Sequence, residues 1–434
     1  MLERLGLNGQ VTWLSVLFWS TALLASVGFP LYAWRVRGRA YAIFALVVLA
    51  ISLPGAIVTH WRLAQIVAPA FLPWFDAAFV FGMISAAAHL TALTRPKLRP
   101  TPFRFAVSLP GMTFIAGGAL AGLWLLALLP VRGILLLLGA DGALGVLRWL
   151  DLTPLVVAGL SVVTSSRLVV EVVRIALATD GPESVTRMPV ERYRRRSPVP
   201  LAQRPLHVVQ ITDPHLGPWQ PVAKLRRCVE ELILDAPDLV LLTGDFLTME
   251  GAGTPGALAE ALSPLSRLTG RCFAVFGNHD HEAPAEVRGA LETNGIHLLL
   301  DDEGIAETEV GPVQIVGVDY RSRERQAHIE GVLGRFPRRP STPRLVLLHD
   351  PSAFKYVPKG EADLVLSGHT HGGQLGLLSF GFDWTVLRRT AWPDHGLFGH
   401  GPNRLYVHRG TGFYGFPLRV GVPGEASRLE LVVK

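Results

Sequence analysis

The chain has 434 residues, of which 49% are hydrophobic and 18% are charged, and its mean hydropathy is +0.34. A chain of this length is too long to fold around one ordinary hydrophobic core, so we expect two or more structural units. The composition is more apolar and less charged than that of a typical soluble domain, which indicates that part of the chain lies in lipid. Cys228 and Cys272 are far apart in sequence and fit neither a disulfide framework nor a zinc knuckle.

The formal net charge of +6 raises the question of a nucleic-acid partner. Much of the positive charge, however, falls in short clusters beside apolar runs. These clusters are Arg35, Arg37 and Arg39; Arg95, Lys97 and Arg99; and Arg192, Arg194, Arg195 and Arg196. Such placement is typical of membrane topology, so we expect a lipid bilayer and no nucleic acid as partner. Nothing in the sequence specifies an oligomeric state.

The first half of the chain contains several runs long enough to cross a membrane, which takes about 20 mostly apolar residues. The four clear runs are Val11 to Trp34, Ala40 to Val58, Val67 to Leu93 and Phe105 to Leu129. A fifth, Leu152 to Ala178, is interrupted by Arg167, Glu171 and Arg174, whose spacing would place them on one helix face. The segment Val131 to Leu150 is rich in glycine and suggests a re-entrant or interfacial piece.

The clusters of positive charge predict how the chain is oriented in the membrane, because such clusters favour the cytoplasmic side. If all of them face the cytoplasm, five spans leave the second half of the chain on the cytoplasmic side, whereas four spans would place Arg192 to Arg196 opposite the other clusters. Asp76 lies near the end of the third run, where we expect an interfacial carboxylate and no proton path.

From Pro205 onward, short β-rich runs alternate with helical stretches, which predicts an α/β domain. The expected strands are Leu206 to Thr212, Leu239 to Thr243, Cys272 to Phe276, Val313 to Val318, Leu345 to Leu348, Leu364 to Ser367, Arg404 to His408 and Leu429 to Val433. The expected helices are Val222 to Leu234, Ala257 to Leu268, Pro284 to Asn294 and Arg325 to Phe336.

Five of the expected strands end in residues that commonly bind metal ions. In chain order they are followed by Asp213-Pro214-His215, Gly244-Asp245, Gly277-Asn278-His279-Asp280, His349 and Gly368-His369-Thr370-His371-Gly372-Gly373-Gln374. Ligands of open α/β sheets gather at the carboxyl ends of strands, so we expect these side chains to converge. Oxygen and imidazole ligands suit manganese, iron, zinc and similar divalent ions.

This set of motifs resembles the calcineurin-like metallophosphoesterase superfamily. The run Gly368 to Gln374, followed by Leu405-Tyr406-Val407, Gly410-Thr411-Gly412 and Pro417-Leu418-Arg419, is similar to its bacterial membrane-associated branch. The resemblance covers Pro205 to Lys434 and implies a four-layer α/β/β/α sandwich and an integral protein of the bacterial inner membrane. The expected organisation is a transmembrane helical region at 1–180, a basic linker at 181–204 and a metallophosphoesterase domain at 205–434.

The resemblance also implies a pair of divalent metal ions that activate a shared water and clamp the phosphate. The first metal would be held by Asp213, His215, Asp245 and His371, and the second by Asp245, Asn278, His349 and His369. His279 would then lie near the substrate phosphate, with Asp280 orienting its ring.

Two positions depart from the common pattern: Thr248 stands where many relatives have Asp, and Pro214 separates the ligands of the first motif. Gln374 supports the site or is a plain surface amide, and His281 contacts substrate or solvent. Aromatic residues are dense near the C-terminus, where three arrangements are open: they contact lipid, line the substrate site or pack over the sheet edge. These residues are Phe380, Phe382, Trp384, Trp392, Phe398, Phe413, Tyr414 and Phe416.

The leading functional hypothesis is a metal-dependent hydrolase of phosphate mono- or diesters or pyrophosphates that acts close to the bilayer, and a lipid-linked substrate fits it. The tether of membrane spans motivates it, because confinement raises the effective concentration of the site for substrates in the membrane. Two alternatives stay open: a nuclease or nucleotide phosphodiesterase, suggested by the positive charge, and a catalytically inactive membrane scaffold.

Overall fold

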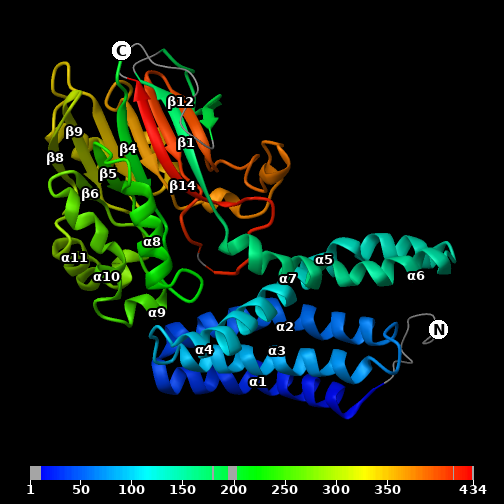
Figure 1. Cartoon of the computed structure of the whole chain (residues 1–434). Coiled ribbons are helices and arrows are strands. Elements are labelled where there is room, and N and C mark those ends of the chain that lie inside the picture. Colours follow the sequence, from blue (N-terminus) through cyan, green and yellow to red (C-terminus); the bar gives the residue numbers. More distant parts are fainter. Residues whose placement is uncertain (1–10, 178–179, 194–202, 414, 433–434) are drawn as a thin grey trace. The chain divides into compact units, whose positions relative to one another are not determined.

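The computed structural model describes residues 11–177, 180–193, 203–413 and 415–432 (Figure 1). It divides into two compact units. Unit 1 comprises Met1–Val163 and Gly415–Leu418, and unit 2 comprises Thr164–Tyr414 and Arg419–Lys434.

Unit 1 is helical. Its elements are α1 (Trp13–Arg37), α2 (Arg39–Ala64), α3 (Leu72–Ala92), α4 (Thr101–Phe103), η1 (Arg104–Ser108), α5 (Leu109–Leu137), α6 (Asp141–Trp149), η2 (Leu150–Leu152) and α7 (Thr153–Ser166). In the part of the chain that the structure describes, continuous helical stretches make five candidate spans, at Trp13–Arg37, Arg39–Ala64, Leu72–Ala92, Thr101–Leu137 and Asp141–Ser166. The expectation of a multi-helix membrane region ahead of an α/β domain is therefore confirmed.

The fourth and fifth spans differ from the expectation in their bounds. Helix α5 continues to Leu137, and the fifth span begins at Asp141, so the segment Val131 to Leu150 belongs to two helices and is no separate re-entrant piece. The fifth helix ends at Ser166, because the next residues form a strand, β1 (Leu168–Ala176). An apolar run rich in valine and isoleucine does not by itself distinguish a helix from a buried strand.

In β1, the charged residues that we expected on one helix face are held by ion pairs of the sheet. Glu171 lies 2.6 Å from Arg192 and 2.9 Å from Arg409, and Arg174 lies 2.9 Å from Glu430 of the neighbouring strand. The expected span to Ala178 is therefore wrong beyond Ser166, and residue 178 itself lies outside the described residues.

Close helix contacts and buried polar groups hold unit 1 together. A side chain at Gly55 of α2 would clash with the backbone of α5, which is typical of membrane helices packed through small residues. Asp76 is fully buried among the helices, and it accepts hydrogen bonds from Ser15 at 2.8 Å and from His60 at 2.7 Å.

Unit 2 contains two seven-stranded mixed sheets. The first has the order β3-β1-β14-β4-β5-β6-β7, with β3 (Glu191–Tyr193), β14 (Gly424–Val432), β4 (Leu206–Ile211), β5 (Leu239–Leu242), β6 (Cys272–Ala274) and β7 (His297–Leu298). The second has the order β2-β12-β13-β11-β10-β9-β8, with β2 (Thr186–Met188), β12 (Gly396–His400), β13 (Asn403–Val407), β11 (Leu364–Ser367), β10 (Arg344–Leu348), β9 (Gly311–Val318) and β8 (Asp302–Thr308).

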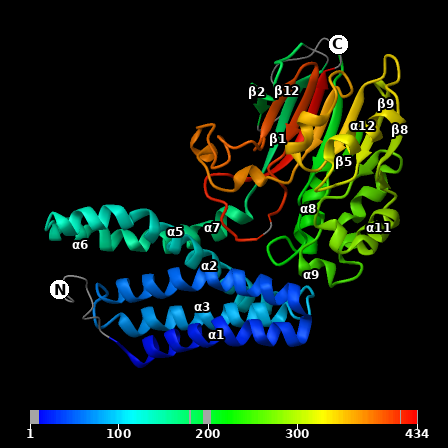
Figure 2. The same cartoon turned by 180° about the vertical axis from the view of Figure 1, so that it is seen from behind.

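Apolar side chains from both sheets form one core between them. This core includes Val173, Ile175, Val208 and Leu241 from the first sheet and Ile315, Leu347, Leu366 and Tyr406 from the second. Helices cover the outer faces, as Figures 1 and 2 show. Beside the first sheet lie α8 (Val222–Ile233), α9 (Met249–Ala252), α10 (Ala257–Leu262) and α11 (Pro284–Thr293), and α12 (Arg325–Arg335) packs on the second. The expected four-layer sandwich is confirmed.

The segment that we expected to be a basic linker contributes two edge strands instead. Strand β2 pairs with β12, and β3 pairs with β1. Arg192 of the expected basic cluster lies in β3, whereas Arg194, Arg195 and Arg196 lie outside the described residues. The sequence missed these strands because each has only three residues, too few for a periodic pattern.

The assignment of β1 to the core of unit 2 makes a stability prediction. Ile175→Ala removes a fully buried side chain that pairs in register with Leu431, so we expect a loss of about 2–5 kcal/mol. Pulse proteolysis in urea on the full-length protein in detergent would measure it. Leu234→Ala, at a position that is 76% exposed in the same unit, is the control and should change little. Equal stability of the two variants would contradict the strand assignment.

Candidate metal centre

The parallel strands of the two sheets place the five predicted motifs at strand ends. β4, β5 and β6 run parallel in the first sheet, and β10 and β11 run parallel in the second. The residues that follow these strands come together as two clusters of potential metal ligands.

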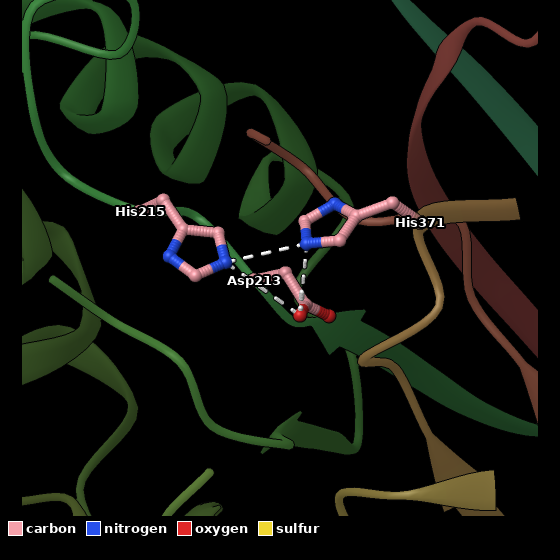
Figure 3. A group of neighbouring side chains, drawn as sticks. All are labelled: Asp213, His215 and His371. Carbon is pink, nitrogen blue, oxygen red and sulfur yellow. Dashed lines mark hydrogen bonds and ion pairs between the residues drawn. The ribbon is translucent and has the colours of Figure 1, made fainter. Parts of the chain in front are cut away.

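The first cluster contains Asp213, His215 and His371, all buried (Figure 3). The Nε2 atoms of the two histidines lie 3.3 Å apart. Oδ1 of Asp213 lies 3.4 Å from Nε2 of His371 and 3.8 Å from Nε2 of His215. Three donor atoms therefore face a common point, as the ligands of one cation do.

The second cluster contains Asp245, His349 and His369. Nδ1 of His369 lies 3.3 Å from Nε2 of His349, which in turn lies 3.2 Å from Oδ2 of Asp245. The same Oδ2 atom lies 3.7 Å from Nε2 of His215 in the first cluster. Asp245 thus stands between the two clusters and connects them.

The backbone at these ligands adopts an unusual conformation. Five candidate ligands have positive φ angles: Asp213 (49°), His215 (43°), Asp245 (58°), His369 (67°) and His371 (50°). The left-handed region costs energy for residues other than glycine, so it persists only where the surrounding structure imposes it. Such strain concentrates at functional sites, and here it aims side chains from strand ends into one place.

Hydrogen bonds fix two of the candidate ligands. Asp213 accepts from Oγ1 of Thr212 at 2.7 Å and from the backbone N–H of His369 at 3.0 Å, which connects the β4 and β11 loops. Nδ1 of His349 lies 2.6 Å from the carbonyl oxygen of Thr243. Donation from Nδ1 to that carbonyl orients the ring and makes Nε2 the nitrogen that would bind a cation in place of a proton, the arrangement found behind metal-binding histidines.

Burial and nearby charges shift the pKa values of the cluster. Burial lowers the pKa of His215 to about 3 and that of His369 to about 4, so both rings are neutral, as metal ligands must be. Burial also opposes protonation of His349, but the carboxylates of Asp245 and Asp213 outweigh it and raise its pKa to about 10. The site therefore attracts positive charge strongly.

Asn278 and the glycine before it also fit a metal centre. Oδ1 of Asn278 is buried and has no hydrogen-bond partner among the described residues. A side chain at Gly277 would clash with Asp245, and the backbone N–H of His279 donates to Oδ1 of Asp245 at 2.9 Å. An unpaired amide oxygen beside a carboxylate is a ligand type that divalent cations accept, so the donor set fits the metals that the sequence suggests.

The structure corrects the expected role of Asp280. Its carboxylate does not orient His279; instead it accepts hydrogen bonds from the backbone N–H groups of Asp245 (2.7 Å), Phe246 (2.8 Å) and Gly277 (2.7 Å). It therefore joins the β5 and β6 loops. Nδ1 of His279 contacts Oε1 of Glu282 at 2.8 Å. Glu282 was not among the predicted site residues, although its spacing of three residues from His279 in a helical turn could have indicated it.

Arg419 is a second residue that the sequence analysis did not single out as part of the site. Its buried guanidinium lies 3.2 Å from Nδ1 of His371 and donates to the carbonyl oxygens of Arg409 at 2.7 Å and Gly412 at 2.6 Å. It therefore fixes the loop of His371. The sequence pattern Pro417-Leu418-Arg419 carried the family resemblance without revealing this contact.

Three further residues named in the sequence, Thr248, His281 and Gln374, lie in different surroundings. Thr248 donates to the carbonyl oxygen of Leu216 at 2.9 Å, which connects the loops after β4 and β5 without a carboxylate. His281 is 40% exposed in its side chain and contacts Asp319 at 3.0 Å. Gln374 has a positive φ of 59°, and its Oε1 is buried without a partner among the described residues, so it is no plain surface amide.

Comparison with known proteins identifies this arrangement. The family described as calcineurin-like phosphoesterase matches residues 206–373. The metallophosphoesterase YkoQ of Bacillus subtilis is 31% identical over 52% of this chain and 83% of its own length. The phosphodiesterase YaeI of Escherichia coli is 29% identical over the same shares. A metallophosphoesterase of Helicobacter pylori is 31% identical over 53% of this chain, and the match spans 60% of that relative's length.

Two mixed sheets with acidic, amide and histidine side chains at their parallel strand ends define a class of metal-binding α/β hydrolase domain. The chain belongs to the calcineurin-like metallophosphoesterase family. The matched region lies in unit 2, so the family does not account for the five candidate spans.

The role of Asp280 predicts a coupled loss of stability and metal. Asp280→Ala leaves three buried N–H groups without an acceptor, at a cost of about 1–3 kcal/mol for each. We expect a lower unfolding free energy together with weaker metal binding, because the Asp245 loop loses its support. Urea unfolding and metal titration would measure the two effects. A stable variant with normal metal affinity would contradict this role.

Proposed function

We propose that the chain is a membrane-anchored, metal-dependent phosphoesterase whose two ligand clusters each hold one divalent cation. The first cation would be held by Asp213, His215, Asp245 and His371, and the second by Asp245, Asn278, His349 and His369. The substrate would be a phosphate mono- or diester or a pyrophosphate.

The observation that carries this proposal is the position of Asp245. Its Oδ2 atom lies 3.7 Å from His215 in one cluster and 3.2 Å from His349 in the other. Two divalent cations at neighbouring sites repel each other, so a carboxylate between them supplies the negative charge that lets both bind.

Bound cations would neutralise phosphoryl oxygens and make a water nucleophilic at neutral pH. His279 supplies the proton that the leaving oxygen needs. Burial opposes protonation of this ring, but Glu282 and Asp245 outweigh it and raise its pKa. The contact of Nδ1 with Glu282 orients the ring, and the side chain is 22% exposed, so the ring is reachable from solvent.

The candidate spans support a substrate at the membrane. Clusters of positive charge flank the connection between α1 and α2 and that between α3 and α4, which lie on one side if each helix crosses the bilayer. With five spans, β1 follows on that same side, which the positive-inside rule makes the cytoplasm. We therefore propose an inner-membrane protein with a cytoplasmic site and a lipid-linked phosphate ester or pyrophosphate as substrate.

The alternatives are less well supported. Arg192, part of the basic cluster that suggested a polynucleotide substrate, forms an ion pair with Glu171 and is partly buried, so it offers little charge to phosphates. An inactive scaffold would have no need for the strained backbone angles at five candidate ligands.

The proposal predicts that Asp245→Asn impairs hydrolysis. Substitutions of residues behind metal ligands typically cost 10–100-fold, so loss of a direct bridging ligand should lower kcat/KM by at least about 100-fold. The assay uses full-length protein in detergent with manganese and bis(p-nitrophenyl) phosphate. Asp302→Asn, at an exposed position in β8, is the matched control.

Metal analysis of the same samples tests the binding site directly. We expect two divalent ions in the wild type and in Asp302→Asn, and fewer in Asp245→Asn. Wild-type protein with less than one ion per chain, or Asp245→Asn with normal activity, would overturn the proposal.

The orientation of His279 gives a second kinetic prediction. Glu282→Gln removes the carboxylate that raises the pKa of the imidazole, so the alkaline limb of the kcat profile should move to lower pH while metal content stays unchanged. Glu286→Gln, which alters a neighbouring carboxylate that instead accepts from the N–H of Gly256, is the control. Identical pH profiles for both variants would contradict the role of Glu282.

A further inference from the structure

Exposed apolar side chains of unit 2 gather in one segment, residues 375–392, which we call the aromatic segment. Unit 2 has eight exposed large hydrophobic side chains among its described residues, and six of them lie here. They are Leu377 (41% exposed), Phe380 (69%), Phe382 (64%), Trp384 (44%), Val386 (45%) and Trp392 (47%). A concentration of this kind marks an interaction surface rather than chance exposure.

The aromatic segment begins and ends at the candidate metal centre. It starts directly after Gln374, three residues beyond His371. At its far end, Oγ1 of Thr370 donates to the carbonyl oxygen of Asp394 at 2.6 Å, and the ring of Trp392 lies 5.9 Å from that of His369. Whatever binds the segment is therefore brought next to the proposed catalytic groups.

The segment has a defined structure of its own. The N–H of Leu377 donates to the carbonyl oxygen of Trp384 at 2.9 Å, and that of Val386 donates to Leu375 at 3.0 Å. The loop is thus closed on itself, and in Figure 1 it is the orange loop that extends away from the strands. Its aromatic side chains are held outward by this scaffold and are not an unfolded hydrophobic tail.

The composition of the segment favours a lipid surface as its partner. Trp384, Trp392 and two phenylalanines are accompanied by Arg388 and Arg389, both exposed, and Asp383 is the only acidic residue. Tryptophan together with arginine is the combination that anchors proteins at the boundary between headgroups and acyl chains. A net positive charge adds attraction to anionic lipids.

The candidate spans also hold the aromatic segment close to a bilayer. It carries five candidate spans, and only Arg167 separates the last helix of the fifth span from strand β1 of unit 2. A tether of this length keeps unit 2 beside the membrane, so the exposed apolar side chains meet lipid at high effective concentration.

We propose that the aromatic segment docks into the surface of the bilayer that carries the spans and presents the metal centre to phosphate groups at the headgroup level. This inference rests on the proposed function for its catalytic consequence, but the docking itself does not depend on hydrolysis. The apolar side chains enter the acyl boundary, and Arg389 faces the lipid phosphates, whereas Arg388 lies 3.5 Å from Asp383 within the segment.

Fluorescent labelling of the full-length protein tests the docking. Phe380→Cys and Trp384→Cys place a reactive thiol on the segment, and Leu234→Cys, 76% exposed on α8's end, is the matched control. The native Cys228 and Cys272 are buried, so an environment-sensitive dye should react at the introduced positions. The labelled proteins are placed in nanodiscs of phosphatidylglycerol and phosphatidylcholine with nitroxide groups on the acyl chains.

We expect blue-shifted emission and severalfold stronger nitroxide quenching at Phe380→Cys and Trp384→Cys than at Leu234→Cys. Equal quenching at all three positions would overturn the proposal. A blue shift without nitroxide quenching would also overturn it, because it would indicate a protein contact such as a second copy of the chain.

A kinetic measurement separates this proposal from the proposed function. The triple substitution Phe380→Ser, Phe382→Ser and Trp384→Ser should lower kcat/KM severalfold for a phosphodiester carried on a lipid and leave that for bis(p-nitrophenyl) phosphate unchanged. An equal loss on both substrates would overturn docking while supporting catalysis. If the wild-type protein hydrolyses neither substrate but shows the expected nitroxide quenching, the proposed function is overturned and the docking proposal stands.

Discussion

The structure of the site depends on the convergence of charged and imidazole groups around one carboxylate, that of Asp245. Its Oδ2 atom lies within 3.7 Å of imidazole nitrogens from both clusters, although these come from different sheets. Burying this many polar groups is costly unless they are paired or bind a cation. The sandwich meets this demand by placing parallel strand ends of two sheets at a common edge.

The convergence of these ligands requires strained backbone conformations. Asp213, His215, Asp245, His369 and His371 all adopt positive φ angles, and glycine is needed where these loops touch: a side chain at Gly277 would clash with Asp245, and one at Gly368 would clash with Asp213. Asp280 and Arg419 hold the loops through hydrogen bonds to backbone groups. Strain at the ligands is thus balanced by buried hydrogen bonds behind them.

The positions of the candidate ligands were predictable from the sequence, because each of them follows an apolar run that forms a strand. Residues 168–176 were misassigned, since a valine-rich run after a helix fits a span as well as a strand. The contact of Arg419 with His371 could not be predicted from local pattern, because it depends on how the loops fold, whereas the spacing of Glu282 from His279 offered a local signal that was not used. The short edge strands β2 and β3 form through pairing with distant strands, which no local periodicity records.

The most direct test of the account is a crystal structure of the manganese-loaded protein with anomalous scattering from the metal. The account predicts two anomalous peaks about 3.5–4 Å apart, one beside Asp213, His215 and His371 and the other beside His349 and His369, with Asp245 touching both. A single peak, or manganese bound away from Asp245, would contradict it.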